Sequence, residues 1–301
     1  MSWAPTIDIV VPCYNVAHIV ERCVNSLLKQ SYRDNTISIY LVNDGSSDST
    51  GRILDSFSRH QHIQIIHLEK NKGLSAARNT GIKAGSGEVI CFLDSDMTVQ
   101  PEWINAHLDM LGEVGIFGVI GDSLLPAEQT PNELDSYLYD LRRGARSIGE
   151  GSPIPFSYFL FNNTSVKRSI FDVIELFDEK ITTYGGEDTE LAIRFWEAYP
   201  EGLRFSSSAS CVHHHPRELI DFCNLMYSYG KTNLPSLLEQ FPQYKAELGG
   251  GWLNSIKGYF LFNSIIRWFI SKMTNLGSSY WLSRYKVIDA AIRGARTVSR
   301  R

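Results

Sequence analysis

Val89-Ile90-Cys91-Phe92-Leu93-Asp94-Ser95-Asp96 is the stretch that decides the fold, because an unbroken apolar run ends there in two carboxylates. It predicts a strand over Glu88–Leu93. A strand with one face in water alternates apolar and polar side chains, whereas a continuous apolar run is typical of a strand covered on both faces. We therefore predict an inner strand of a parallel sheet, with a polar edge at its carboxyl end.

Three similar runs precede this strand and alternate with stretches of helical spacing. The runs predict strands at Ile7–Val11, Ile37–Val42 and Ile63–Leu68. The stretches between them predict helices at Ala17–Lys29, at about Ser49–His60 and at about Ser75–Ala84. Strands that alternate with helices in this way are typical of βαβ units. The sequence thus predicts an α/β fold with a Rossmann-like, mostly parallel sheet flanked by helices.

The rest of the chain predicts fewer strands and, from Pro216 onward, only helices. Downstream of Pro101 we expect a strand at Gly115–Ile120, loops at Leu124–Pro131, Gly144–Pro155 and Ile181–Gly186, a helix at Thr189–Ala198 and a short strand at Leu203–Phe205. Three helical pieces follow, with a break at residues 248–251. The expected organisation is one domain over residues 1–215 and a helical C-terminal region over residues 216–301.

The charge of the chain is unevenly distributed. The 301 residues, 43% of them hydrophobic and 21% charged, have a formal net charge of -4. From Gly251 to Arg301 there are nine Lys or Arg and one acid, Asp289, which gives +8 for this segment and -12 for the first 250 residues. A basic, aromatic-rich tail suggests contact with an anionic surface. A tail that is simply solvated is the alternative.

The tail contains an amphipathic stretch, Trp252–Lys272. Its apolar residues at roughly helical spacing are Leu253, Ile256, Phe260, Ile266, Phe269 and Ile270, accompanied by Lys257, Arg267, Lys272, Trp252, Tyr259 and Trp268. A basic helix of this kind can lie in a bilayer interface, so residues 252–301 predict a peripheral contact with the inner face of a membrane. Packing of the helix on the rest of the chain or in a dimer interface is the alternative.

The cysteines and the apolar stretches indicate a cytoplasmic location. Five scattered cysteines without a CxxC pair argue against a disulfide framework and fit a reducing compartment. The first residues lack the basic and apolar regions of a signal peptide. The longest apolar stretch, residues 258–270, is interrupted by Asn263, Ser264 and Arg267 and falls short of the ~20 residues of a spanning helix. We expect a chain that does not cross a membrane.

Polar or glycine-rich turns follow all four predicted strands of the first hundred residues. They are Pro12-Cys13-Tyr14-Asn15, Asn43-Asp44-Gly45-Ser46-Ser47-Asp48, Asn71-Lys72-Gly73 and Asp94-Ser95-Asp96. Ligands of parallel sheets bind beyond the carboxyl ends of the strands, so two carboxylate clusters on one edge predict a site. The third turn opens a helix, whose amides together with Lys72 or Arg78 favour an anion such as a diphosphate. An exposed basic first turn is the alternative.

The acidic residues in these turns admit a functional and a structural interpretation. Carboxylates two residues apart, as at Asp94 and Asp96, can share a hard cation and the phosphates that it bridges, although acidic turns are common. We expect Asp48 or Ser49 to cap the next helix, which leaves Asp44 to accept hydrogen bonds from a base or ribose.

In order and spacing, these motifs resemble the signatures of family 2 glycosyltransferases with the GT-A fold. The motifs are Val11–Asn15, Asn43–Thr50, Asn71–Gly73 with Ala77–Asn79, and Asp94–Asp96. The resemblance implies a GT-A catalytic domain with a nucleotide-binding half over residues 1–100 and an acceptor-binding half over residues 101–215. It implies nucleotide contacts through Pro12, Tyr14, Asn15, Asp44, Asn71, Lys72, Gly73, Arg78, Asp94 and Ser95.

The resemblance also implies individual roles within this set. Pro12, Tyr14 and Asp44 would surround the nucleobase. Arg78 would lie near the base or diphosphate and Asp94 near the ribose. Asp96 would be a ligand of Mn2+ or Mg2+.

The second half of the chain extends the resemblance. Tyr184–Leu191 is similar to the acceptor-side acidic motif of the family, which implies that Asp188 is the general base for an acceptor hydroxyl and that Glu187 orients the acceptor. The alternative is that both residues merely cap the helix at Thr189–Ala198. Asn163 occupies a place that implies contact with the donor sugar or the acceptor, although an Asx turn explains this residue equally well.

A run of histidines, Cys211-Val212-His213-His214-His215-Pro216, follows the last predicted strand. The resemblance implies a metal-ligating histidine here. Because side chains alternate along a strand, His213, the first candidate, and His215, the second, would share one face, and His214 would point away.

The function implied is an inverting, metal-dependent transfer of a sugar from a nucleotide diphosphate sugar to a hydroxyl of a glycan or lipid-linked acceptor, as in polysaccharide biosynthesis. UDP is the expected nucleotide, with dTDP and GDP left open. One alternative is a nucleotidyltransferase of sugar phosphates, but Pro12–Asn15 replaces the basic glycine-rich loop that such an enzyme carries after its first strand. A non-catalytic nucleotide- or sugar-binding module is the other. We expect no nucleic-acid partner, and the sequence leaves a homo-oligomer open.

Overall fold

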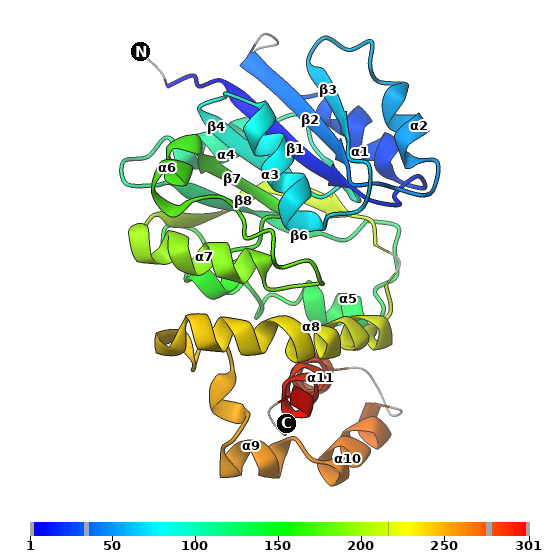
Figure 1. Cartoon of the computed structure of the whole chain (residues 1–301), viewed down its shortest axis with the longest axis vertical. Coiled ribbons are helices and arrows are strands. Elements are labelled where there is room, and N and C mark those ends of the chain that lie inside the picture. Colours follow the sequence, from blue (N-terminus) through cyan, green and yellow to red (C-terminus); the bar gives the residue numbers. More distant parts are fainter. Residues whose placement is uncertain (1–2, 33–35, 216, 275–278, 299–301) are drawn as a thin grey trace. The chain divides into compact units, whose positions relative to one another are not determined.

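The computed structural model describes residues 3–32, 36–215, 217–274 and 279–298, which form two compact units. Unit 1 comprises residues 1–126, 144–182 and 187–215, and unit 2 comprises residues 127–143, 183–186 and 216–301. Figure 1 shows an α/β unit that contains the sheet and a unit made of helices. The predicted α/β fold with a helical C-terminal extension is therefore confirmed.

Unit 1 is built around an eight-stranded sheet with the strand order β3-β2-β1-β4-β7-β6-β8-β5. The strands are β1 Ile7–Cys13, β2 Ile37–Asn43, β3 Ile63–His67, β4 Val89–Leu93, β5 Met97–Val99, β6 Gly118–Leu124, β7 Asn163–Lys167 and β8 Leu203–His213. The first four are parallel, and Val10 lies opposite both Tyr40 and Phe92. Strand β7 is antiparallel to β4 and β6, and β5 is antiparallel to β8, so the sheet is mixed but mostly parallel in its first half.

Helices cover both faces of β1. The α-helices of unit 1 are α1 Val20–Leu27, α2 Thr50–Asp55, α3 Leu74–Ala84, α4 Trp103–Leu111, α6 Phe171–Ile174 and α7 Glu187–Ala198. Ile9 and Val11 share one core with α1, α2 and α4. Val10 points to the other face, where α3 passes so closely that a Cβ at Gly81 would lie 2.5 Å from Val10 Cγ1. All seven residues of β1 are buried, as its apolar run predicts.

Two strands differ from their predicted bounds by more than two residues. The strand predicted at Gly115–Ile120 begins at Gly118, because Gly115 has a φ of 82° and lies in a turn. The strand predicted at Leu203–Phe205 continues to His213, because its first part pairs with β6 and its last residues also pair with β5. The longer strand places His213, the first of the three histidines, in the sheet.

Unit 2 consists of helices. They are α5 Glu133–Leu138, α8 Leu219–Gln240, α9 Ile256–Leu261, α10 Ser264–Thr274 and α11 Tyr280–Val298. Helices α8 and α11 pack through glycines: a Cβ at Gly230 would lie 1.9 Å from Ala291 O, and one at Gly294 would lie 2.1 Å from Tyr227 O. Among the described residues, no helix combines the length and apolar character that crossing a bilayer requires.

The prediction of one amphipathic helix over Trp252–Lys272 is wrong. The structure has two helices there, separated at Phe262 and Asn263. Asn263 Oδ1 accepts hydrogen bonds from the amides of Ile265 at 2.8 Å and Ile266 at 3.0 Å, so its side chain starts the second helix. Because the helix is interrupted at this point, the stretch is not one continuous amphipathic helix.

Candidate active site

The turn after β2 holds the loop that enters α3. Asp44 is buried, and its two carboxylate oxygens accept hydrogen bonds from the amides of Lys72 at 2.7 Å and Gly73 at 3.0 Å. Gly45, with a φ of 65°, lets the loop pass closely, since a Cβ there would lie 2.4 Å from Asn71 N. We expected Asp44 to accept hydrogen bonds from a base or ribose. In the structure its carboxylate also fixes the loop that enters α3.

The side chain of Asn15 joins the turns after β1 and β2. Asn15 has a left-handed φ of 52°, and its Oδ1 accepts from the amide of Ser47 at 2.9 Å. Asp48 accepts from the amide of Thr50, the first residue of α2, at 2.9 Å. Tyr14 is 48% exposed, so an aromatic ring is accessible at this edge of the sheet. Of the remaining predicted nucleotide contacts, Pro12 and Ser95 are buried, and Asn71 and Lys72 are exposed.

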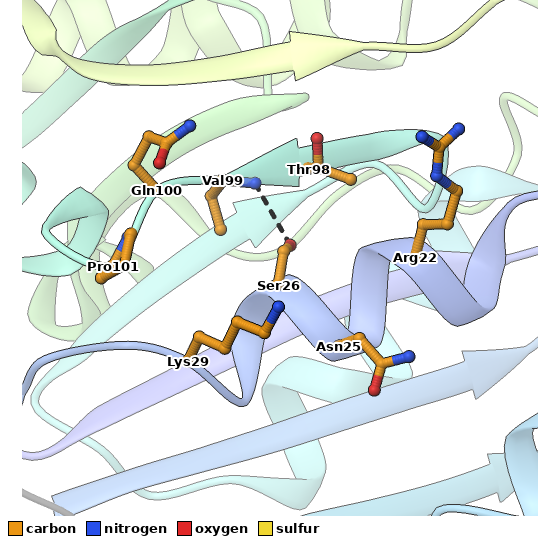
Figure 2. Close-up of a pocket in the computed structure, with 8 residues that line it drawn as sticks. All are labelled: Arg22, Asn25, Ser26, Lys29, Thr98, Val99, Gln100 and Pro101. Carbon is orange, nitrogen blue, oxygen red and sulfur yellow. Dashed lines mark hydrogen bonds between the residues drawn. The ribbon is translucent and has the colours of Figure 1, made fainter.

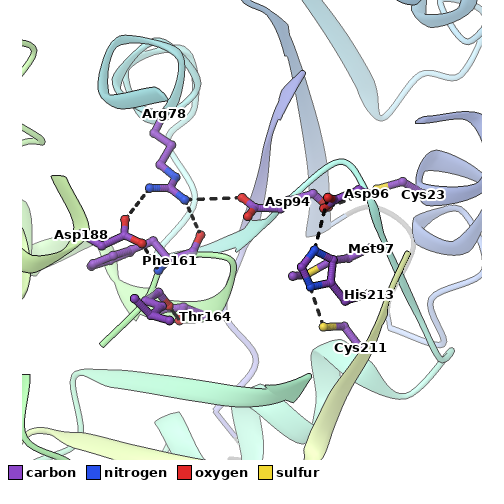
Figure 3. A network of polar contacts seen from close by, with 11 residues as sticks. Cys23, Arg78, Asp94, Asp96, Met97, Phe161, Thr164, Asp188, Cys211 and His213 are labelled. Atoms are coloured by element: carbon purple, nitrogen blue, oxygen red, sulfur yellow. Dashed lines mark hydrogen bonds and ion pairs between the residues drawn. The ribbon is translucent and has the colours of Figure 1, made fainter. Parts of the chain in front are cut away.

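A buried arginine joins the two acidic motifs (Figure 3). Arg78, on α3, is only 1% exposed. Its Nη1 donates to Asp188 Oδ1 at 2.5 Å, and its Nη2 lies 3.4 Å from Asp94 Oδ1. Burial acts to lower the pKa of Arg78, but the charges of Asp188 and Asp94 outweigh it, so the pKa lies above its ordinary value. One guanidinium therefore holds carboxylates from both halves of unit 1.

Asp188 and Glu187 lie in the first turn of α7. Gly185 and Gly186 precede them with φ angles of 78° and 102°, a region that favours glycine. The side chain of Asp188 is 15% exposed, and its Oδ2 accepts from the amide of Phe161 at 3.2 Å. Burial and then the charge of Asp188 raise the pKa of Glu187 to about 7. Its Oε2 is buried and has no hydrogen-bond partner among the described residues.

Asp96 and His213 face each other where β5 pairs with β8 (Figure 3). Asp96 Oδ2 lies 3.2 Å from His213 Nε2. His214 points to Thr98, with its Nε2 2.9 Å from Thr98 Oγ1. His215 is buried, and its ring centroid lies 4.6 Å from that of His213. His213 and His215 thus lie together, and His214 lies apart from them.

The donor set at Asp96 fits a cation that binds together with a nucleotide. Within the described parts of the chain, no group of three or more His, Cys, Asp or Glu side chains can enclose a metal ion. Asp96 offers a carboxylate, which suits Mg2+ and Mn2+, and His213 offers an imidazole, which is a common ligand of transition-metal ions. Magnesium at nucleotide sites takes one or two carboxylates and completes its shell with water and phosphate oxygens. Two protein ligands therefore suffice for such a site.

Asn163 is the first residue of β7 and lies opposite Leu93 at the end of β4, but its side chain is buried. It is fully buried, and its Oδ1 accepts from Trp103 Nε1 at 2.8 Å and lies 3.2 Å from His107 Nε2. Its Nδ2 donates to Asp122 O and Ala209 O, both at 2.9 Å. Burial lowers the pKa of His107 to about 4, so this network is neutral. This position gives no support to the predicted contact of Asn163 with a sugar or acceptor.

A basic hollow of about 450 Å³ is lined by none of the predicted site residues (Figure 2). It is lined by Arg22, Asn25, Ser26, Lys29, Thr98, Val99, Gln100 and Pro101. The amide of Val99 donates to Ser26 Oγ at 3.2 Å and so ties α1 to β5 at its base. None of the lining residues belongs to the motifs, and the candidate site is therefore the network around Arg78.

Two features of this network were missed by sequence reasoning. Arg78 was expected beside the base or diphosphate, and the structure buries it between Asp94 and Asp188. Phe161 contributes its backbone, because its amide bonds Asp188 and its carbonyl oxygen accepts from Arg78 Nη2 at 3.1 Å. Every residue type has these backbone groups, so the sequence contains no motif from which the contacts of Phe161 could be predicted.

Comparison with known sequences identifies a family. The sequence model described as "Glycosyl transferase family 2" matches residues 8–164. A segment of 93 residues is 48% identical to the uncharacterized glycosyltransferase EpsJ of Bacillus subtilis (strain 168), covering 31% of this chain and 26% of that protein. The chain thus matches about a quarter of the length of that relative.

Two solved structures share the fold. The mannosyltransferase PcManGT from Pyrobaculum calidifontis, in complex with GDP-Man and Mn2+, has a TM-score of 0.68 at 14% identity, over 98% of this chain and 87% of that chain. S. aureus TarS in complex with UDP has a TM-score of 0.58 at 17% identity, over 98% of this chain and 91% of that one. These similarities confirm the GT-A type of fold, and the family model matches more than half of the chain. The chain belongs to glycosyl transferase family 2.

Proposed function

We propose that the chain transfers a sugar from a nucleoside diphosphate sugar to a hydroxyl of a glycan or lipid-linked saccharide, with inversion at the anomeric carbon. The observation that carries this proposal is the Arg78 bridge, which holds Asp94 and Asp188 on one buried guanidinium. A single displacement requires donor and acceptor to meet within the width of one sugar. Because Asp94, on the proposed donor side, and Asp188, on the proposed acceptor side, contact the same guanidinium, the two carboxylates lie close enough for this.

Asp188 is the general base in this proposal. Arg78 holds Oδ1 and the amide of Phe161 bonds Oδ2, so the carboxylate is fixed in orientation while its side chain remains partly exposed. In this position it takes the proton of the acceptor hydroxyl as that oxygen attacks the anomeric carbon. Glu187, whose pKa is raised to about 7, is partly protonated at neutral pH. It orients the acceptor by donating or accepting a hydrogen bond.

The donor binds at the carboxyl ends of β1, β2 and β4. Tyr14 offers an exposed ring to the base, and Asp44 accepts from the base in addition to the loop amides that it already bonds. Asp94 bonds the ribose. Asp96 and His213, with His215 as the second candidate, would hold a Mn2+ or Mg2+ ion, which would offset the negative charge of the diphosphate.

The nucleotide and the compartment belong to the same proposal. UDP is the first candidate and GDP the second, since structural neighbours bind UDP in one case and GDP-Man with Mn2+ in the other. The five cysteines are free and buried, which fits a reducing compartment. We therefore place the enzyme in the cytoplasm, in a pathway of polysaccharide biosynthesis.

The test is Asp188→Asn, which keeps the size of the side chain and removes the base. Slow hydrolysis of UDP- and GDP-sugars with Mn2+ is measured by nucleotide release, and loss of the base should reduce the rate about 10²–10⁴-fold. Nucleotide binding measured by calorimetry should persist, which shows that unit 1 is folded although Arg78 has lost a charged partner. Asp172→Asn, an exposed acid on α6, is the control and should keep the wild-type rate. Wild-type turnover in Asp188→Asn contradicts the base assignment, and a wild-type chain that binds nucleotide without hydrolysing any donor indicates a binding module.

A further inference from the structure

Helices α9 and α10 expose an unusual density of large apolar side chains. The exposed residues are Ile256, Tyr259, Phe260, Leu261, Ile265, Trp268, Phe269 and Met273, and they are called the α9–α10 face below. Phe262, between the helices, turns inward and joins the buried core of unit 2 with Leu253. Within unit 2, α11 lies between α8 and this pair of helices (Figure 1). Since the side chains of the face are exposed, they are not part of the buried core of their own unit.

The segment that forms this face carries only positive charges of its own. Residues 251–274 contain Lys257, Arg267 and Lys272 and no acid. The single acid of the last 51 residues, Asp289, is buried and bonded to Arg267 at 2.7 Å. Lys257 and Lys272 are exposed. A partner of this face must accordingly accept apolar side chains and carry negative charge itself.

A second copy of the chain does not have this chemistry. In a twofold-symmetric dimer the same surface meets itself, so Lys257 and Lys272 of one copy would approach those of the other without an acid on the face to neutralise them. Like charges brought together across an interface oppose association.

An anionic lipid surface supplies both requirements. Its acyl boundary takes up Trp, Phe and Ile side chains, and its headgroups attract lysine. Lysine stems can run along apolar surface while the ammonium groups stay at the level of the headgroups. Helices of 6 and 11 residues are suited to lie in the plane of such an interface and need not span the bilayer.

We propose that the α9–α10 face binds the interface of a bilayer that contains anionic phospholipids and holds the chain there as a peripheral protein. The surface belongs to unit 2 alone, and Asp188 and Arg78 are not part of it. Membrane binding and sugar transfer can therefore fail independently, and the experiment below contains neither a donor nor an acceptor.

The test is co-sedimentation of the full chain with vesicles of phosphatidylcholine, with and without phosphatidylglycerol. The wild type should bind the mixed vesicles more tightly than the neutral ones, and added salt should reduce the difference. Ile265→Ser combined with Phe269→Ser should lower the partition coefficient at least about ten-fold, because two side chains no longer enter the acyl boundary. Lys257→Gln combined with Lys272→Gln should bring binding to mixed vesicles close to that of neutral ones.

The matched control is Ile220→Ser. Ile220, on α8, is 67% exposed, the same fraction as Ile265, so its replacement removes equal apolar exposure outside the α9–α10 face and should leave partitioning unchanged. Circular dichroism checks that every variant is folded. Wild-type partitioning in Ile265→Ser/Phe269→Ser, or an equal loss in Ile220→Ser, overturns the proposal. The proposal is also overturned if the wild-type chain binds neither kind of vesicle. This includes the case in which sedimentation velocity shows a dimer that Ile265→Ser/Phe269→Ser converts to a monomer.

Discussion

At the scale of single residues, Arg78 shows how the acidic motifs are brought together. A buried guanidinium without charged partners would be strongly unfavourable, and replacing one partner of a buried ion pair typically costs about 3–5 kcal/mol. Asp188 and Asp94 both bond Arg78, while burial raises the pKa of Asp94 to about 6 against the opposing effect of Arg78. Loss of Arg78 would thus damage folding and the site together, which makes neighbouring residues better probes of function.

Glu187 is such a probe, because its carboxyl is buried with a pKa of about 7 compared with 4.5 for the ordinary group. The folded chain holds this proton more tightly than the unfolded chain does. Through this group, stability therefore falls as pH rises from about 4.5 to about 7 and stays low above that. Glu187→Gln removes the penalty, so the variant should exceed the wild type in free energy of unfolding by on the order of 1–3 kcal/mol at pH 8.

The measurement for Glu187→Gln is urea unfolding at pH 5 and pH 8, and the gain should be several-fold smaller at pH 5, where the carboxyl of the folded chain is protonated. Glu197→Gln, an exposed position on the same helix, serves as the control and should show no such pH dependence. A gain of the same size at both pH values would mean that burial of the Glu187 charge is not its cause.

Residue types alone located the two acidic motifs but not the contacts between them. Asp94, Asp96 and Asp188 could be chosen from their neighbours in sequence, since each follows a strand or opens a helix. The part played by Phe161 depends on backbone atoms. The surroundings of Asn163 could not be predicted either, because its side chain is buried in a network with Trp103 and His107, which only the tertiary structure reveals.

At the scale of elements, the contact between α8 and α11 sets a strict limit on side-chain size. Gly230→Ala would place a methyl group 1.9 Å from Ala291 O, and overpacking of this kind typically costs about 1–3 kcal/mol. Helix propensity acts in the opposite direction, since alanine is favoured over glycine by about 1 kcal/mol. We expect the steric term to win and the midpoint of thermal unfolding to fall. Gly251→Ala, where a Cβ meets nothing within 4 Å, should leave it unchanged, and equal midpoints for the two variants would refute the close contact.

Elements with a strong local pattern were predicted well, and those defined by distant partners were not. The apolar runs located β1 to β4 within one or two residues. The full length of β8 could not be predicted, because Ser206–Ser210 lacks β-branched or large apolar residues and the strand depends on pairing with β6 and β5. The break between α9 and α10 has a local cause in Asn263, but the surrounding apolar spacing concealed it.

At the scale of the whole molecule, composition indicated a folded body and a basic tail. It did not indicate which earlier segments of the chain belong to the same compact unit as the tail. Leu134 and Tyr137 of α5 pack in one core with Leu219 and Tyr280. A helix of six residues carries too little pattern to show this, and contacts between residues this far apart in sequence are set by the tertiary fold. The predicted division at residue 215 therefore omitted segments 127–143 and 183–186 of unit 2.

The stability of the whole chain offers a test of donor and metal binding that needs no acceptor. A ligand at 100 times its Kd adds about 2.7 kcal/mol to the folded state. For a chain of this size that is a rise of several degrees in Tm, since about 1 kcal/mol corresponds to roughly 2–4 °C. UDP with Mn2+ should raise the Tm more than GDP with Mn2+, and a chelator should remove most of the rise.

Asp96→Ala should lose the metal-dependent part of the rise in Tm, because one carboxylate ligand is gone. Asp109→Ala, which replaces an exposed acid on α4, should retain it. A metal-dependent rise of wild-type size in Asp96→Ala would show that the cation binds elsewhere, whereas a larger rise with GDP would reverse the choice of nucleotide and leave the metal site intact.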